Sequence, residues 1–82
     1  MLKKEFNYNK VRGRIKEKLK SEAKFAEKLE ISQASLSAKF NNRTDFTASE
    51  IFRAADPDVL DIPLNEIGDY FFISKLDLKL RN

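Results

Sequence analysis

The side chains able to perform acid–base or metal chemistry in this sequence are carboxylates and lysines, because its 82 residues include no Cys and no His. Without these two residue types, disulfides, thiolate metal sites and the commonest general base are excluded. The carboxylates and lysines follow no spacing typical of a catalytic pocket, and no Gly-rich phosphate loop is present. We therefore expect a protein that is not an enzyme, with no cofactor, no metal and no small-molecule substrate.

The most informative stretch is residues 21–42, SEAKFAEKLEISQASLSAKFNN. Its pattern predicts two short helices, Glu22–Leu29 and Gln33–Phe40, with Ser21 and Ser32 as N-caps. Phe25, Ala26 and Leu29 form the inner face of the first helix, and small Ala26 lies where the helices cross. The crossing is fixed by apolar residues, namely Leu29, Ile31, Leu36 and Phe40. This packing leaves the first half of the second helix projecting with short polar side chains. Such a helix fits the major groove of B-DNA, about 12 Å wide.

This stretch resembles the helix-turn-helix of phage Cro and repressor DNA-binding domains. The residues that match are Ser21-Glu22, Phe25-Ala26, Leu29, Ile31-Ser32-Gln33, Leu36 and Phe40-Asn41. Beyond them, the segments FNYNKVRGRIKEK, TASEI and IPLNEIGDYFF are similar to small Cro-like regulators in phages of Gram-positive bacteria, over roughly residues 6–72. The chain departs from the family pattern at Glu30, where Gly usually supplies a positive φ, and at Glu22, where Gln often contacts a phosphate.

The resemblance implies which side chains meet DNA. Those facing base edges would be Gln33, Ala34, Ser37 and Ala38. Gln33 suits an adenine N6/N7 edge, and the alanine methyls suit thymine methyls. Those along phosphates would be Ser32, Ser35, Lys39, Asn41, Asn42 and Arg43, with Lys24 and Arg14 from the preceding helices.

The remaining sequence predicts one mainly α-helical domain over residues 1–82, with five helices. The first expected helix covers residues 9–20. The fourth follows a capping box at Thr47 and Glu50 with Ile51, Phe52 and Ala55 inward, and the fifth follows Pro63 with Ile67, Tyr70 and Phe71 inward.

The tail, residues 73–82, alternates apolar and polar residues and predicts a short β-strand. Residues 2–8 are a candidate second strand. Leu76, Leu78 and Leu80 form one apolar stripe, which we expect to be the interface of a homodimer. The tails would pair with each other, or each would pair with residues 2–8; alternatively the tail completes the core of its own domain.

Charge is divided along the chain. Residues 1–24 carry nine Lys or Arg against three Glu, whereas residues 46–72 carry one Arg against six acids. This asymmetry indicates one face that meets a polyanion and one that avoids it. We expect a transcriptional regulator of the bacterial cytoplasm, bound at operator DNA on the nucleoid. The alternative is an antirepressor that uses the same fold to bind a phage repressor protein. No apolar run is long enough to span a membrane.

Overall fold

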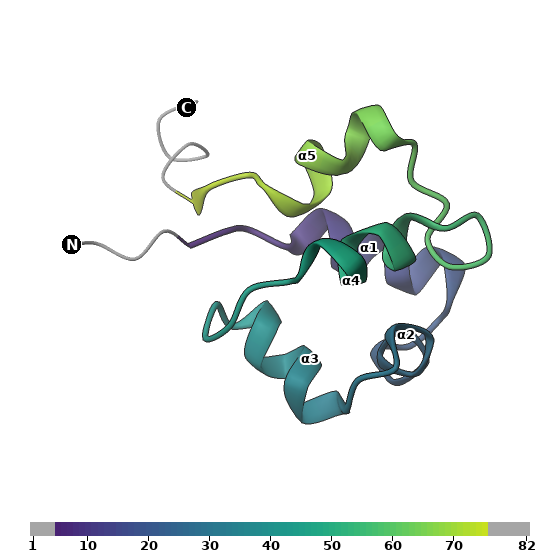
Figure 1. Cartoon of the computed structure of the whole chain (residues 1–82), viewed down its shortest axis with the longest axis horizontal. Helices are drawn as coiled ribbons and strands as arrows, with labels where there is room; N and C mark the ends of the chain where they lie inside the picture. Colours follow the sequence, from purple (N-terminus) through teal and green to yellow (C-terminus); the bar gives the residue numbers. More distant parts are fainter. Residues whose placement is uncertain (1–4, 76–82) are drawn as a thin grey trace.

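Five α-helices build the domain, as the computed structural model shows for residues 5–75, the part of the chain that the structure describes (Figure 1). They are α1 (Asn9–Lys18), α2 (Glu22–Leu29), α3 (Gln33–Phe40), α4 (Ala48–Ala55) and α5 (Ile67–Phe71). A single 3₁₀ turn, η1 (Leu64–Glu66), precedes α5 after Pro63. The mainly helical fold is therefore confirmed, and α2 and α3 have the predicted bounds.

Side-chain caps explain where three of the helices begin. The hydroxyl of Ser21 accepts a hydrogen bond from the Lys24 N–H at 3.2 Å, and that of Ser32 accepts one from the Ser35 N–H at 3.0 Å. At the start of α4, Thr47 Oγ1 accepts from the Glu50 N–H while the Glu50 carboxylate accepts from the Thr47 N–H. These contacts satisfy backbone donors that a helix leaves unpaired in its first turn.

Helix α2 is central to the packing, because it contacts α1, α3 and α4. Its buried residues Phe25, Ala26 and Leu29 form its inner face, as predicted. Around them lie the other members of the core, among which are Val11, Ile15, Leu36, Phe40, Ile51, Ala54, Leu60, Tyr70 and Phe71. This single core holds α3 by Leu36 and Phe40, so the rest of α3 can face outward.

Two predictions about the helices were wrong. Helix α1 ends at Lys18 instead of Lys20, because the backbone of Lys20 turns to a positive φ of 74° before Ser21 starts the next helix. Phe52 was expected inward, but its side chain lies outside with 61% of its surface exposed. Successive helical residues differ by about 100° around the axis, so burial of Ile51 and Ala55 turns Phe52 away from the core.

The two ends of the described chain meet. Phe6 and Ser74 form an isolated antiparallel bridge. The Asn7 N–H donates to the Ile73 carbonyl at 2.8 Å, and the Lys75 N–H donates to the Glu5 carbonyl at 3.0 Å. Within residues 5–75 this pairing is a bridge and not a strand of several residues. The predicted interface residues Leu76, Leu78 and Leu80 lie outside the described residues.

Candidate nucleic-acid interface

The outer face of α3 is polar and uncharged. Gln33, Ala34 and Ser37 are exposed there and Ala38 is half-buried, so these side chains share the outward face of one helix. Three of the predicted phosphate contacts flank them, namely Ser32, Ser35 and Asn41, all exposed. The Asn41 amide donates to the Ser37 carbonyl at 2.9 Å and to its hydroxyl at 3.3 Å.

Lys39, which was expected at a phosphate, is turned into the molecule instead. Its ammonium donates to the Asp45 carbonyl at 3.0 Å and lies 3.1 Å from the Glu50 carboxylate. Only about 10% of its side-chain surface is exposed. Lys39 therefore fastens the end of α3 to the start of α4, and it is the one charged residue of α3.

Glu50 is held as a carboxylate by these neighbours. Burial by itself would raise its pKa, but the backbone N–H of Thr47 and the Lys39 ammonium outweigh that effect. The net result is a pKa below the ordinary value for a glutamate. Lys39 and Glu50 thus form a largely buried ion pair that connects α3 to α4, in contrast to an ion pair on the surface.

Arg14 and Asn42 also have internal partners in place of phosphates. The Arg14 guanidinium donates to the carbonyls of Leu60 at 2.7 Å and Asp61 at 2.8 Å. The buried Asn42 amide accepts from the Phe6 N–H at 2.9 Å and donates to the Phe6 carbonyl at 3.0 Å. Both side chains join distant parts of the chain, so the phosphate contacts expected of them are revised.

Glu30 occupies the left-handed position of the turn between α2 and α3, with a φ of 59°. The family resemblance implied this conformation, in which a non-Gly residue carries strain. The Glu30 carboxylate pairs with the guanidinium of Arg53 from α4. Arg53 therefore neutralises the charge of Glu30, which is one of the two acidic residues that depart from the family pattern.

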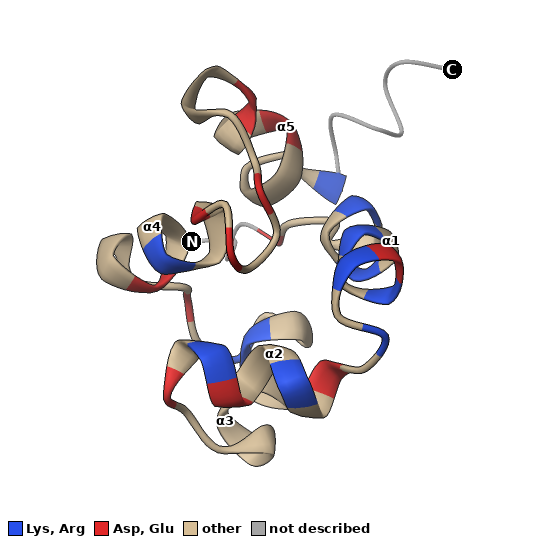
Figure 2. Ribbon diagram, turned by 90° about the vertical axis from the view of Figure 1, so that its right-hand side faces the viewer, with Lys and Arg blue, Asp and Glu red and all other residues tan. Residues whose placement is uncertain are grey.

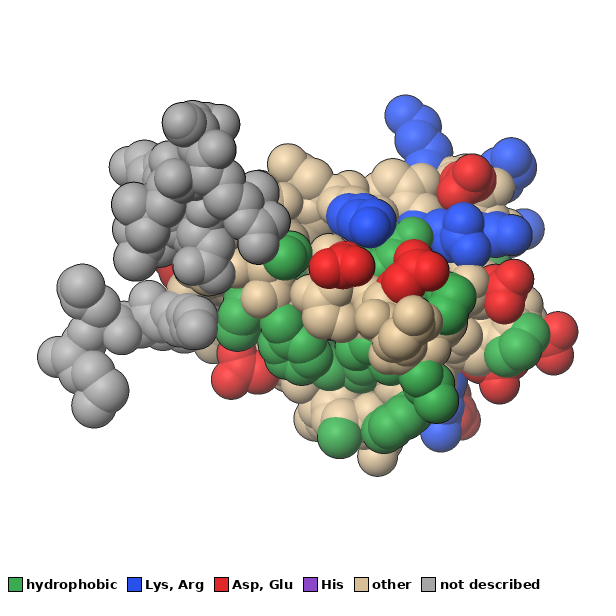
Figure 3. Space-filling view, turned by 90° about the horizontal axis from the view of Figure 1, so that it is seen from above, with side chains coloured by type: hydrophobic (Ala, Val, Ile, Leu, Met, Phe, Trp, Pro, Cys, Tyr) green, Lys and Arg blue, Asp and Glu red, His purple; other side chains and the backbone are tan. Residues whose placement is uncertain are grey.

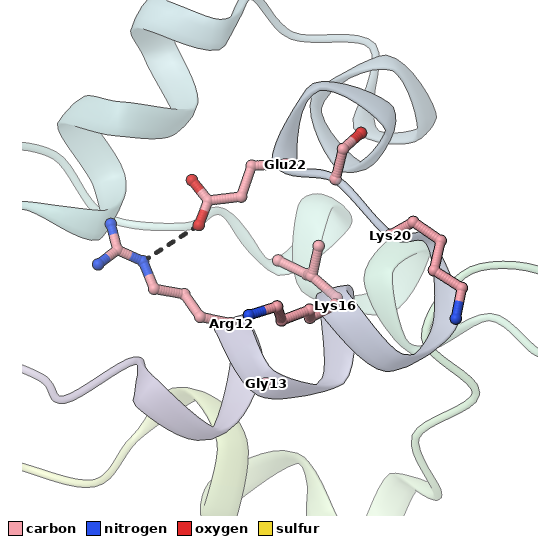
Figure 4. A pocket seen from close by; sticks show the side chains of 7 residues that line it. Arg12, Gly13, Lys16, Lys20 and Glu22 are labelled. Atoms are coloured by element: carbon pink, nitrogen blue, oxygen red, sulfur yellow. Dashed lines mark ion pairs between the residues drawn. The ribbon is translucent and has the colours of Figure 1, made fainter.

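The other departure, Glu22, is neutralised by Arg12. Nε of Arg12 lies 3.4 Å from Glu22 Oε2, and its guanidinium carbon lies 4.6 Å from the centroid of the Phe40 ring. Arg12 thus connects the start of α2 with the end of α3. Between α1 and the start of α2 lies a hollow of about 380 Å³, lined by this ion pair and by two lysines. Lys16 lies beside Arg12, whereas Lys20 lies on the other side of the hollow (Figure 4).

Charge separates across the molecule as it does along the sequence. Helix α1 carries more of the basic ribbon than any other helix, whereas the α4–α5 region is mainly acidic (Figure 2). Seen from above, most of the Lys and Arg side chains gather toward one edge and hydrophobic side chains toward the other (Figure 3). Of the predicted phosphate contacts, Lys24 and Arg43 are exposed and make no ion pair within the described part of the chain.

Residues 4–74 match the model of a family described as "Protein of unknown function (DUF739)". The chain belongs to this family. No curated protein matches the sequence. The description of the DUF739 family carries no activity, so the likeness to Cro and repressor domains remains a prediction made from residues 6–72.

Two further observations concern the described part of this DUF739 chain. No helix there is long and apolar enough to cross a membrane. Residues 5–75 also contain no cluster of three or more acidic residues arranged to hold a metal ion.

Sequence reasoning missed Lys16 as a residue of the candidate interface. A signal for it exists, because Arg12 and Lys16 are four residues apart and therefore share one face of α1. The spacing does not predict that this face of α1 lies next to the start of α2. That contact arises from the packing of α1 on α2.

Proposed function

We propose that this protein binds double-stranded DNA in a sequence-specific way through α3, as a Cro-like repressor at phage or prophage operators. The observation that carries the proposal is the presentation of α3. Leu36 and Phe40 anchor the helix in the core, while Gln33, Ala34 and Ser37 face outward at its N-terminal half. A helix anchored in this way presents short side chains at the depth needed to read base edges.

Gln33 is the principal base-reading residue of the proposal. It is the first residue of α3, it is exposed, and its amide has no hydrogen-bond partner within residues 5–75. An amide in this position can accept from adenine N6 and donate to adenine N7 at once. The methyl groups of Ala34 and Ala38 add apolar contacts suited to thymine.

Phosphate contacts set the register of α3 in the groove. The exposed cations that support this role are Lys24 and Arg43, together with Lys16 and Lys20 around the hollow at the start of α2. The pairing of Glu22 with Arg12 removes the negative charge that would otherwise repel a phosphate there. Hydroxyl and amide groups of Ser32, Ser35 and Asn41 lie beside them on the α3 side.

The test is a fluorescence-anisotropy titration with labelled duplexes taken from the DNA on either side of the protein's own gene. We expect one duplex to bind at least about 1,000-fold more tightly than a scrambled duplex of equal length and composition. Binding that is equal for every duplex, or absent, would refute the proposal. A circular dichroism spectrum of the same sample verifies that the protein is folded.

A second candidate function is the binding of a phage repressor protein through the same α3 face. It is favoured by one observation: with Lys39 turned inward, α3 exposes no charged side chain. A helix face without charge can bind the surface of another protein as well as the base edges of the DNA major groove. In this case the titration would show no binding by the protein alone, and DNA occupancy by the repressor would fall when the protein is added.

A further inference from the structure

A second surface with the character of a binding site lies on the far side of α4 from its buried face. Phe52 and Leu64 are exposed there to 61% and 69%. Between them is a groove of about 350 Å³, lined by Phe52, Ala55, Asp56, Pro57, Asp61, Ile62, Pro63 and Leu64. Adjoining apolar side chains of this size, left open to solvent, mark an interaction surface.

The charge around this groove restricts what can occupy it. Asp56 and Asp61 are part of its lining, and exposed Asp58 lies between them in sequence. The nearest cation of α4, Arg53, is paired with Glu30. The rim therefore repels DNA, and two such grooves placed face to face would bring like charges together. The matching occupant carries apolar side chains together with positive charge.

Among the segments of this chain, two are basic enough to match. Helix α1 supplies positive charge, but its apolar residues Val11 and Ile15 are buried in the core. Residues 76–82, LDLKLRN, combine both properties, since Leu76, Leu78 and Leu80 alternate with polar residues that include the cations Lys79 and Arg81. Lys75, just before them, is paired with Glu5 of its own copy. Alternation of this kind places leucines on one side of an extended segment and most of the charges on the other.

We propose that residues 76–82 of one copy occupy the Phe52–Leu64 groove of a second copy, so that two copies exchange their tails and form a twofold dimer. The leucines would cover Phe52 and Leu64, and the long side chains of Lys79 and Arg81, which start from the opposite side of the segment, would bend over its edges to the aspartates of the rim. This proposal does not depend on DNA binding, and it replaces tail-to-tail pairing as the origin of the expected homodimer.

The position of the tail's attachment favours exchange between copies. The bridge between Phe6 and Ser74 fixes the chain just before residue 75. That point and the connection between α4 and α5 lie toward opposite ends of the long axis of the molecule (Figure 1). The groove of the same copy is therefore poorly placed for the tail, whereas the groove of a partner has no such restriction.

The test is a complementation experiment with two full-length variants. The groove variant, Phe52→Ser with Leu64→Ser, keeps its tail; the tail variant, Leu76→Ser with Leu78→Ser and Leu80→Ser, keeps its groove. Mass is measured by light scattering over a concentration series, and pairing of differently labelled variants is measured by energy transfer. Ala23→Ser with Ala48→Ser, which changes two exposed apolar residues outside the groove, is the control.

We expect the wild type and the Ala23→Ser, Ala48→Ser control to be dimers and each variant alone to be a monomer. The mixture of the two variants should form pairs, at higher concentration than the wild type, because one tail and one groove remain intact. Raised salt should weaken all of this pairing. Thermal unfolding of each variant verifies that it is folded.

Three results would overturn the proposal. A monomeric wild type excludes it, and so does a groove variant that still dimerises, which would indicate pairing between tails. A mixture that forms no pairs at the highest soluble concentration also excludes it. Each of these outcomes is independent of the DNA titration, so a failure here and a failure of the proposed function can be told apart.

Discussion

The ammonium of Lys39 lies 3.1 Å from the carboxylate of Glu50. About 10% of the Lys39 side-chain surface and 16% of the Glu50 side-chain surface are exposed. This ion pair connects α3, the proposed reading helix, to the capping box of α4. The same contact that withdraws a cation from the outer face of α3 therefore fixes the orientation of that face. Its consequences can be measured.

The first prediction concerns acid stability. Because the folded protein lowers the pKa of Glu50 below 4.5, the stabilisation is present at neutral pH and is lost as the pH falls through that lowered pKa. Glu50→Gln should lower the free energy of unfolding by about 1–3 kcal/mol at pH 7. Urea titrations at pH 7 and pH 3 should show the difference between variant and wild type shrinking in acid.

The matched control for this prediction is Glu27→Gln, which changes an exposed glutamate of α2 that makes no ion pair within residues 5–75. It should alter stability by less than about 0.5 kcal/mol at either pH. An equal loss for Glu27→Gln and Glu50→Gln would mean that net charge, and not the ion pair with Lys39, determines the acid response.

The second prediction concerns base reading by Gln33. Gln33→Ala should weaken binding to the specific duplex by about 1–3 kcal/mol and leave binding to the scrambled duplex nearly unchanged. Anisotropy titrations with both duplexes measure the two effects. Parallel loss of both affinities would show that Gln33 does not read a base.

The third prediction concerns the turn at Glu30. Glu30→Gly should stabilise the protein by up to about 1 kcal/mol, because Gly relieves the left-handed strain and the exposed pair with Arg53 contributes little. Thermal unfolding measures the change. Glu27→Gly within α2 is the control and should instead destabilise by about 1 kcal/mol; a fall in both melting temperatures contradicts the argument from strain.

The fourth prediction concerns Asn42, whose amide supports Phe6 and whose own backbone has a φ of 61°. Asn42→Ala should cost about 2–4 kcal/mol of stability, because two hydrogen bonds are lost and Ala tolerates that φ less well. Urea unfolding measures it. The neighbouring Asn41→Ala removes only local bonds to Ser37 and should cost far less.

The fifth prediction concerns the hollow between α1 and α2. Lys16→Gln and Lys20→Gln should each weaken binding to every duplex alike and reduce the slope of log affinity against log salt by about 1. Lys18→Gln, an exposed lysine of α1 that does not line the hollow, is the control. A slope unchanged by the first two substitutions would place the phosphates elsewhere.

The helices could be predicted from the sequence because their signals are local. Ser21, Ser32 and Thr47 cap the residues that follow them within three positions, and the apolar spacing of α2 and α3 needs no distant partner. The left-handed conformation of Glu30 was also expected, but from the family resemblance, in which Gly usually occupies this position.

The partners of the long polar side chains could not be predicted in this way. Lys39, Arg14 and Asn42 each contact a segment that only the tertiary fold brings near, as in the 36 residues that separate Asn42 from Phe6. A lysine on a short polar helix looks the same in sequence whether it meets phosphate or a buried carboxylate. Phe52 was placed wrongly for a related reason. Its apolar side chain follows buried Ile51 in sequence and was therefore expected in the core, but the rotation of the helix directs it to solvent.

The pairing of Phe6 with Ser74, reinforced by Asn42, also has a consequence during synthesis. Phe6 leaves the ribosome early, but its backbone partners at Ile73 and Lys75 emerge only after all five helices have been made. A nascent chain halted before this point has its helices and no closure between Phe6 and Ser74. Closure between Phe6 and Ser74 therefore follows the synthesis of the five helices and cannot precede it.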